Sequence, residues 1–185
     1  RKEMKNYRPI TKTSHVYKLF VKIIENRISS QLERNQNANQ AGFRRGFSTT
    51  DHLFTVQQLM EKCDEFQIDI FMGFVDFEKA FDTVEHPYLW RALKKQGIDE
   101  KTIKIMKKIY DNSSSVIEME NKSRSFKTGR GIKQGCCLSP KFFNAVLQDI
   151  IDEIDWGEIG IKIDGKQLNE LRKLMVFRKK LWKNY

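Results

Sequence analysis

The residues with the clearest chemical potential form one octapeptide, Val75-Asp76-Phe77-Glu78-Lys79-Ala80-Phe81-Asp82. Asp76 lies at the end of an apolar run that starts at Ile68, and the pattern of this run predicts a strand buried on both faces. Burying a carboxylate is unfavourable unless a partner offsets its charge, and a divalent cation is one such partner. The other interpretation is a strand-end carboxylate that caps the following turn. On the octapeptide alone the two interpretations are equally supported.

Three further motifs accompany this octapeptide in a definite order along the chain. The first is Asn6-Tyr7-Arg8-Pro9-Ile10, and the second is Gln40-Ala41-Gly42-Phe43-Arg44-Arg45-Gly46. The third follows the octapeptide and reads Gly131-Ile132-Lys133-Gln134-Gly135-Cys136, with Leu138-Ser139-Pro140 just beyond it. In this order and spacing the motifs resemble the reverse transcriptases of non-long-terminal-repeat retrotransposons, the LINE-like elements. Each motif alone is a weak signal, whereas four in order across residues 6–144 are a strong one.

The resemblance implies the α+β fold of a right-hand polymerase. Residues 1–66 would be a fingers-like region, residues 67–171 a partial palm with an antiparallel sheet, and the thumb would be missing. Residues 172–185 would be a basic tail outside the family pattern. The implied activity is RNA-directed DNA synthesis, with an RNA template, a DNA primer and deoxynucleoside triphosphates as partners and two Mg²⁺ ions as cofactors.

The resemblance also implies roles for residues of the octapeptide. Asp76 would be the catalytic carboxylate and a metal ligand, assisted by the backbone carbonyl of Phe77. Phe81 matches the aromatic side chain that lies under the sugar and excludes a 2′-hydroxyl; its alternative is one more buried phenylalanine among 13. Asp82 is expected to be a local structural partner and not a second metal ligand.

Residues of the flanking motifs complete the implied nucleotide site. Arg8 would clamp the triphosphate, a task that suits a guanidinium fork, or would be a plain surface arginine. Gln134 would line the nucleotide pocket, and Gly135 would let the backbone approach the base pair closely. Arg44 and Arg45 lie in the loop that the family uses near template and nucleotide.

Lys133 has two interpretations of equal weight. It would contact a template phosphate, or it would be a solvated lysine of an exposed loop.

Two departures from the family pattern bear on activity. Cys137 stands where the family usually has proline, a change that we expect to be tolerated. After a strand pair such as residues 159–171 the family supplies an aromatic residue followed by Ala-Asp-Asp, but the 185 residues contain no Asp-Asp pair. One carboxylate cannot hold two Mg²⁺ ions, so we expect an inactive fragment of a polymerase. A non-catalytic nucleic-acid-binding remnant of a mobile element is the alternative, and an incompletely folding piece with an exposed sheet edge is a third.

Charge points to a nucleic-acid partner without identifying one. Lysine and arginine number 34 against 24 acidic residues, a net charge of +10. Six of the basic residues, and no acidic one, follow Leu171, which leaves 28 against 24 in the rest of the chain. This abrupt change favours a shifted reading frame or a mispredicted exon, and a genuine basic amphipathic helix is the alternative.

Composition excludes several other classes of protein. No apolar run approaches the roughly 18 residues of a membrane span, and we expect no signal peptide. Cys63, Cys136 and Cys137 are odd in number and lack CxxC spacing, so we expect no disulfide-linked partner and no zinc site. Together with the resemblance, these observations predict an intracellular protein of the nucleus or cytoplasm. The first residue is Arg1, which suggests a chain cut from a longer one.

Helices and antiparallel strands must position these motifs. Helices are predicted at residues 14–32 after a Ser14 cap, 48–64 after a Ser48 capping box, 87–95, 101–110 and 140–154. Hairpins are predicted to join residues 116–120 to 124–128, and residues 159–163 to those after Lys166 across Asp164-Gly165. The first helix is expected to bury one apolar stripe, which comprises Val16, Phe20, Ile23, Ile24, Ile28 and Leu32.

Overall fold

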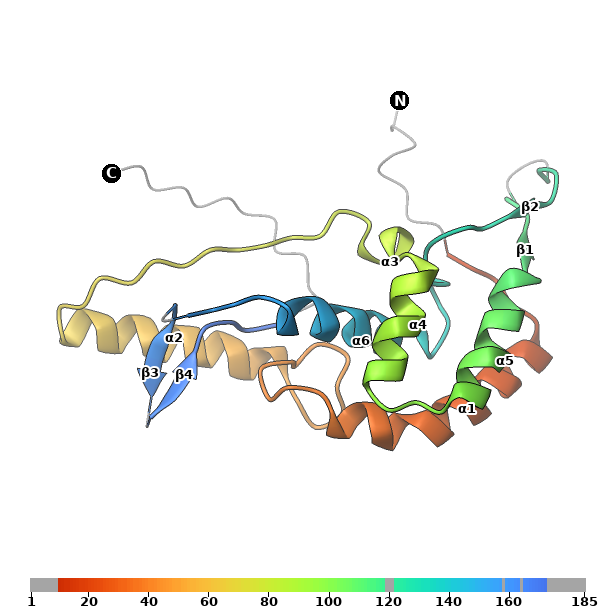
Figure 1. The fold of residues 1–185 in the computed structure, drawn as a ribbon. Helices are drawn as coiled ribbons and strands as arrows, with labels where there is room; N and C mark the ends of the chain where they lie inside the picture. Colours follow the sequence, from red (N-terminus) through yellow and green to blue (C-terminus); the bar gives the residue numbers. More distant parts are fainter. Residues whose placement is uncertain (1–9, 119–121, 158, 164, 173–185) are drawn as a thin grey trace, which may run out of the picture. The chain divides into compact units, whose positions relative to one another are not determined.

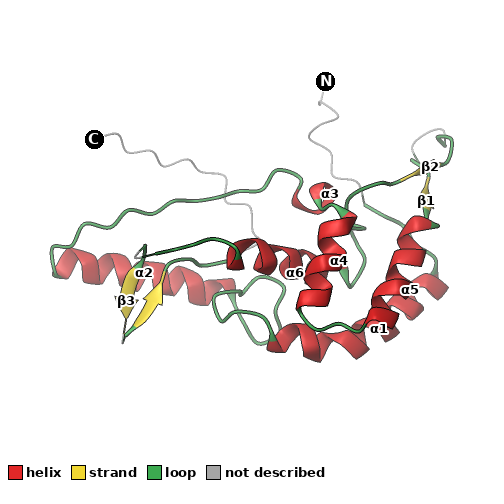
Figure 2. Cartoon of the chain, viewed as in Figure 1, coloured by secondary structure: helices red, strands yellow, loops and turns green. Residues whose placement is uncertain are grey.

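The computed structural model describes residues 10–118, 122–157, 159–163 and 165–172 (Figure 1). They belong to two compact units, and each unit combines stretches that are distant in the sequence. Unit 1 joins Arg1–Asn37 to Lys79–Asp155, and unit 2 joins Ala38–Glu78 to Trp156–Tyr185. Helices dominate both units and short antiparallel strands complete them, which confirms the predicted α+β class (Figure 2).

Unit 1 is built around its last helix. Its elements are α1 (His15–Arg34), α3 (Ala80–Thr83), α4 (His86–Lys95), α5 (Glu100–Asp111), β1 (Ser114–Ser115), β2 (Phe126–Lys127) and α6 (Ser139–Asp152). Helix α6 contacts α1, α3 and α4, and it buries every residue from Phe142 to Asp149. A helix that is buried on nearly all sides needs apolar residues all round, and between Phe142 and Leu147 the sequence of α6 supplies them at every position except the buried Asn144.

Local signals in the sequence account for where these helices begin and end. The Ser14 side chain accepts a hydrogen bond from the Tyr17 N–H, and Asp99 caps α5 in the same way through Thr102. Between α4 and α5 the chain reverses at Gly97, whose φ of +80° favours glycine. The predicted helices at residues 14–32, 87–95, 101–110 and 140–154 are therefore confirmed, within one or two residues at each end.

The predicted apolar stripe of α1 is wrong in its first half. Helix α1 buries Val21, Ile24, Ile28 and Leu32, whereas Val16 is 79% exposed and Phe20 and Ile23 are also exposed. Five residues separate Val16 from Val21, which places the two side chains about 140° apart around the helix axis. Only the face defined by the later residues is buried within unit 1.

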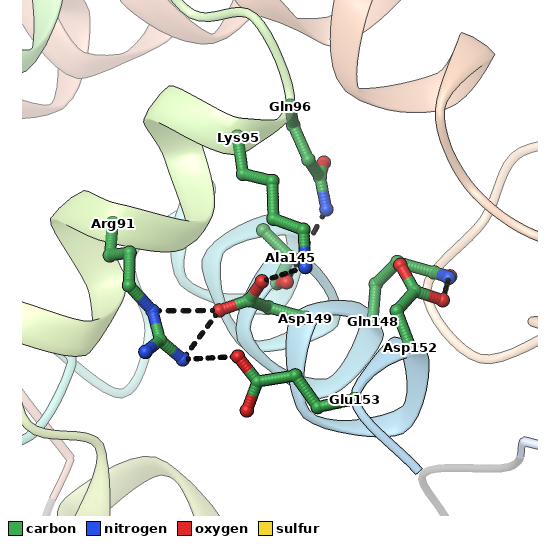
Figure 3. A network of polar contacts seen from close by, with 8 residues as sticks. All are labelled: Arg91, Lys95, Gln96, Ala145, Gln148, Asp149, Asp152 and Glu153. Atoms are coloured by element: carbon green, nitrogen blue, oxygen red, sulfur yellow. Dashed lines mark hydrogen bonds and ion pairs between the residues drawn. The ribbon is translucent and has the colours of Figure 1, made fainter. Parts of the chain in front are cut away.

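A charged network holds α4 against α6 (Figure 3). The carboxylate of Asp149 is 4% exposed; it accepts hydrogen bonds from Arg91 Nε at 3.1 Å and Nη2 at 2.9 Å, and Lys95 Nζ lies 2.8 Å from its other oxygen. Glu153, one turn later, accepts a further bond from Arg91 Nη2 at 3.1 Å. Burial raises the pKa of Asp149, but the hydrogen bonds from Lys95 and Arg91 outweigh this effect, and the pKa lies below its ordinary value.

Unit 2 contains α2 (Thr49–Glu65), β3 (Ile161–Ile163) and β4 (Lys166–Leu168). The predicted capping box is present: Ser48 accepts from the first turn of α2, and the Asp51 side chain accepts from the Ser48 N–H at 3.1 Å. The strands β3 and β4 pair antiparallel with Ile161 opposite Leu168, as the second predicted hairpin requires. Of its predicted turn, Gly165 has a φ of +75° and Asp164 lies outside the described residues.

Arg172, the first residue of the predicted tail, is part of the packed structure of unit 2. Its N–H donates to the Asn39 carbonyl at 2.8 Å, and its carbonyl accepts from the Ala41 N–H at 3.2 Å. The buried guanidinium forms an ion pair with Glu170 at 2.7 Å. Arg172 is therefore packed within unit 2, and residues 173–185 lie outside the described part of the chain.

The predicted buried strand at residues 68–77 is wrong. This stretch is extended but forms no strand, and Phe71, Phe74 and Val75 are 94%, 86% and 81% exposed. A strand needs a neighbour for its N–H and C=O groups and a cover for each apolar face. None of the described residues pairs with this stretch as a strand.

The first predicted hairpin exists, but its register is displaced. Ser114 pairs with Lys127 and Ser115 with Phe126, so the first paired strand precedes its expected range while the second lies within it, and a single bridge joins Glu118 to Lys122. These strands are largely exposed and lack a buried face, so no apolar pattern fixes their register.

No helix in the described ranges is long and apolar enough to cross a membrane.

Candidate functional site

The glycine-bearing loop of residues 129–138 lies against the segment that contains α3. The Ile132 N–H donates to the Phe81 carbonyl at 2.8 Å, and the Gly131 N–H donates to the Val84 carbonyl at 2.7 Å. His86 Nε2 lies 3.0 Å from the Gly131 carbonyl oxygen. These contacts join the loop to the end of the octapeptide, about fifty residues earlier in the sequence, and all of the contacting residues belong to unit 1.

Gly131 permits this close approach. A Cβ at this position would lie 3.1 Å from the carbonyl oxygen of Asp82 and 3.2 Å from its Cα, and the backbone φ is +90°. Both the space and the conformation therefore require glycine.

The side chain of Gln134 is fixed by the octapeptide. Its Nε2 donates to Asp82 Oδ1 at 3.0 Å, and its backbone carbonyl accepts from the Thr11 N–H at 2.9 Å. Asp82 is thus a local structural partner, as predicted. Gly135 is exposed with a φ of +96°, a backbone conformation that favours glycine.

Phe81 is half-buried and stacks on a residue of α6. Its ring centroid lies 5.4 Å from that of Phe143, with 28° between the ring planes. Phe143 is buried, so the contact fixes one side of the Phe81 ring while part of the side chain remains at the surface.

Lys133 is not a solvated loop lysine, so that interpretation is wrong. The side chain is half-buried, and its Nζ lies 4.8 Å from the ring centroid of Tyr17 and 5.5 Å from that of Tyr110. Burial lowers the pKa of this lysine and raises the pKa of both tyrosines. The template contact stays a prediction.

Asp76 and Phe77 belong to unit 2, in the exposed extended stretch before α3. The structure therefore brings together Phe81, Gln134 and Gly135 in unit 1, whereas Asp76 and Phe77 belong to the other unit. Arg8 lies outside the described residues.

The donor set of the described residues does not fit a pair of Mg²⁺ ions. Each Mg²⁺ requires near-octahedral oxygen coordination, and two ions need several carboxylate oxygens between them. In the described ranges no three His, Cys, Asp or Glu side chains gather as metal ligands. Asp76 with the Phe77 carbonyl supplies only part of one coordination sphere, and the Asp82 carboxylate already accepts a hydrogen bond from Gln134.

The loop before α2 combines basic and aromatic side chains. The Arg44 guanidinium lies 3.9 Å above the Phe47 ring centroid, while Phe43, Arg45 and Phe47 are exposed. Phe43 has a φ of +55°, an uncommon conformation for a bulky residue. Exposed rings beside arginines are the ingredients of a single-strand binding surface.

The sequence did not reveal three residues that contact the glutamine-glycine loop: one hydrogen-bonds to Gln134 and two place their rings beside Lys133. Thr11, Tyr17 and Tyr110 stand in no recognisable motif, and a tyrosine within a helical apolar pattern is usually a core residue. Phe43 and Phe47 were also missed, although their location on either side of Arg44 and Arg45 was a usable signal for a stacking surface.

Comparison with known proteins supplies independent information. A family model described as reverse transcriptase (RNA-dependent DNA polymerase) matches residues 1–167. The Pol polyprotein of the type-1 retrotransposable element R2 from Popillia japonica is 32% identical over 148 residues, which cover 79% of this chain and 20% of that relative. The corresponding polyprotein of the type-2 element R2DM from Drosophila melanogaster is 24% identical over 163 residues, 88% of this chain and 15% of the relative.

A third relative is the 149 kDa protein of transposon TX1 from Xenopus laevis, 26% identical over 149 residues. That alignment covers 80% of this chain and 11% of the relative. The chain thus spans a fifth or less of the length of these three curated relatives.

Proposed function

Since this chain belongs to the reverse transcriptase family of non-long-terminal-repeat retrotransposons, we propose that it supplies the nucleotide-binding part of an RNA-directed DNA polymerase. Its substrates would be deoxynucleoside triphosphates, an RNA template and a DNA primer, acting inside the cell in the nucleus or cytoplasm. We assign residues 1–66 to the fingers and residues 67–171 to a partial palm.

One observation carries this proposal: the hydrogen bond between Gln134 and Asp82. It holds the glutamine-glycine loop beside the segment of Phe81, so that the implied pocket residue and the implied sugar gate belong to one arrangement. The Gln134 amide nitrogen is occupied by the Asp82 carboxylate, which orients the planar carboxamide. We propose that Gln134, Gly135 and Phe81 bind the nucleotide and that Arg8 pairs with its phosphates.

We further propose that this chain alone does not catalyse nucleotidyl transfer. Bound Mg²⁺ ions would supply activation of the primer hydroxyl and charge neutralisation at the triphosphate. Asp76, with the Phe77 carbonyl, would contribute one carboxylate to them. The described residues lack the remaining ligands, and the sequence contains no Asp-Asp pair.

The test combines nucleotide binding with primer extension. The wild-type chain should bind a fluorescent deoxynucleoside triphosphate, and Gln134→Ala should weaken binding about three- to tenfold because one hydrogen-bonded pocket residue is lost. The matched control is Gln167→Ala, which removes a glutamine side chain with an exposed hydrogen bond in unit 2. The wild-type chain should not extend a DNA primer on RNA with Mg²⁺. Extension that Asp76→Ala abolishes would contradict the inactivity, and equal binding by Gln134→Ala would contradict the pocket.

A second candidate function is nucleic-acid binding without chemistry. The loop at residues 43–47 supports it, since exposed Phe43 and Phe47 offer stacking faces and Arg45 an exposed positive charge. Single-stranded RNA should then bind with an affinity that falls steeply as salt rises, because phosphate contacts release counterions. Arg45→Met should reduce the salt slope by about one, with Lys162→Met of the same unit as control. Binding that is indifferent to salt would refute this function.

A further inference from the structure

The residue just before Gln134 has an environment that is unusual for lysine. Lys133 Nζ lies 4.8 Å from the centroid of the Tyr17 ring and 5.5 Å from that of Tyr110. Both distances fall within the reach of about 6 Å at which a ring face attracts a cation. Among the described residues no carboxylate forms an ion pair with this ammonium group, which lies within cation–π distance of both tyrosine rings.

The backbone of Lys133 is held as firmly as its side chain. Its carbonyl oxygen accepts hydrogen bonds from Ser139 Oγ at 2.8 Å and from the Cys136 N–H at 3.1 Å. Ser139 is buried at the start of α6, while Tyr17 belongs to α1 and Tyr110 to α5. Lys133 therefore ties the glutamine-glycine loop to three helices of unit 1.

We propose that Lys133 is a positioning residue, whose ammonium group lies on two tyrosine rings and thereby fixes the following Gln134 and Gly135 in the orientation that a nucleotide requires. The role in nucleotide binding rests on the proposed function, but the fixed position of the loop is a property of the chain without nucleotide. Lys133 touches neither substrate nor reacting atoms; it acts through its neighbours in the loop.

The geometry favours this role over a contact with template phosphate. A lysine kept for phosphate extends into water, where its ammonium is fully hydrated before the ligand arrives. Lys133 instead gives up part of its hydration in the free chain, which agrees with the lowering of its pKa by burial. The attraction of the ring faces offsets the lost hydration of the ammonium group only while the side chain stays on the rings. Displacing the loop would break this attraction, so the interaction holds the loop in place.

The test is amide hydrogen exchange of the intact chain, followed by mass spectrometry of the peptide that covers residues 130–139. The N–H groups of Ile132 and Cys136 are bonded within or from this loop and report its opening. Lys133→Met, which keeps the length of the side chain but removes the charge, should speed their exchange about three- to tenfold. Lys133→Arg should restore the wild-type rate, because a guanidinium also lies favourably on an aromatic face.

Matched variants separate this effect from a general loss of charge or stability. Lys101→Met removes one exposed charge from α5 of the same unit and should leave loop exchange unchanged. Tyr17→Phe keeps the ring face and should exchange slowly, whereas Tyr17→Leu should exchange fast. Thermal melting of each variant verifies that the chain folds. Where Lys133→Met does not melt cooperatively, equal exchange rates in the two Tyr17 variants would overturn the positioning role.

The outcomes distinguish the positioning role from the proposed function. Loop exchange in Lys133→Met within twofold of wild type would overturn the positioning role, and so would fast exchange in Lys133→Arg. If Lys133→Met instead lowers only the salt-dependent binding of RNA, the template contact is correct and the positioning role is wrong. Failure of the wild-type chain to bind nucleotide would refute the proposed function alone, since the exchange experiment contains no nucleotide.

Discussion

Asp149 allows a sharp test of how a partly buried charge network contributes to stability. Its carboxylate is 4% exposed, whereas its partners Arg91 and Lys95 are 49% and 51% exposed. The two sides of the network therefore respond differently to mutation. Removing the carboxylate leaves two cations that water can still solvate, but removing both cations leaves a carboxylate that water barely reaches.

The expected magnitudes follow from this asymmetry. Asp149→Asn should cost about 1.5–3 kcal/mol, the value of a charged hydrogen bond whose remaining partners return to solvent. The double variant Arg91→Met with Lys95→Met should cost about 3–5 kcal/mol, because it leaves an uncompensated buried charge. Lys94→Met breaks an exposed pair with Glu100 and should leave the free energy of unfolding nearly unchanged.

The pH dependence gives an independent check with a definite sign. The pKa of Asp149 is lowered in the folded chain, so its contribution is present above the unfolded pKa of about 3.9 and is lost as the pH falls through the folded value. In the double variant only burial remains, the pKa rises above the unfolded value, and stability should fall as the pH rises from about 3.9 towards the raised folded pKa.

Urea denaturation followed by circular dichroism measures these free energies of unfolding between pH 3 and pH 8. If Asp149→Asn destabilises the chain as much as the double variant does at pH 7, the proposed asymmetry of the network is refuted. A double variant that gains no stability on acidification would refute it equally.

Three further predictions concern the backbone and the exposed extended stretch. Gly131→Ala should lower the free energy of unfolding by about 1–3 kcal/mol, because the residue has a positive φ and lies close to the Asp82 backbone. Gly129→Ala, with open space around it, should change this free energy little. Equal melting temperatures for the two variants would contradict the prediction. Ser48→Ala should cost about 1 kcal/mol by removing the α2 cap, and Ser48→Asp should recover most of it in the same melt. The double variant Phe71→Lys with Phe74→Lys should reduce self-association and the binding of a dye that recognises exposed apolar surface, without lowering the melting temperature, because both rings are exposed. A lowered melting temperature would show that the two rings are packed.

What the sequence predicts well is what neighbouring residues decide. The caps at Ser14 and Ser48 and the reversal at Gly97 each depend on side chains within a turn of the helix end, and each was predictable. The second hairpin was predictable for the same reason, since its turn and its strands are adjacent in the chain.

What failed depends on partners that are distant in the sequence. The alternation at residues 68–77 is that of a buried strand, but burial requires neighbours, and the pattern does not state whether they are present. The location of Val16 at the surface likewise depends on which part of α1 the later helices cover.

The candidate site divides in the same way. Gln134, Gly135 and Phe81 were identified from motifs, because spacing along the chain is all that a motif requires. The hydrogen bond from Gln134 to Asp82 and the location of Lys133 between Tyr17 and Tyr110 join residues from separate elements. No local pattern encodes such contacts.

The way in which unit 1 is assembled from two distant stretches has a consequence during synthesis. Glu33 of α1 forms an ion pair with Lys141 of α6 at 2.9 Å, across 108 residues of chain. At typical rates of translation about 5–20 s pass between the emergence of these two residues from the ribosome. During that interval the apolar face of α1 has no α6 to cover it, so the nascent chain exposes Val21, Ile24, Ile28 and Leu32 until α6 emerges.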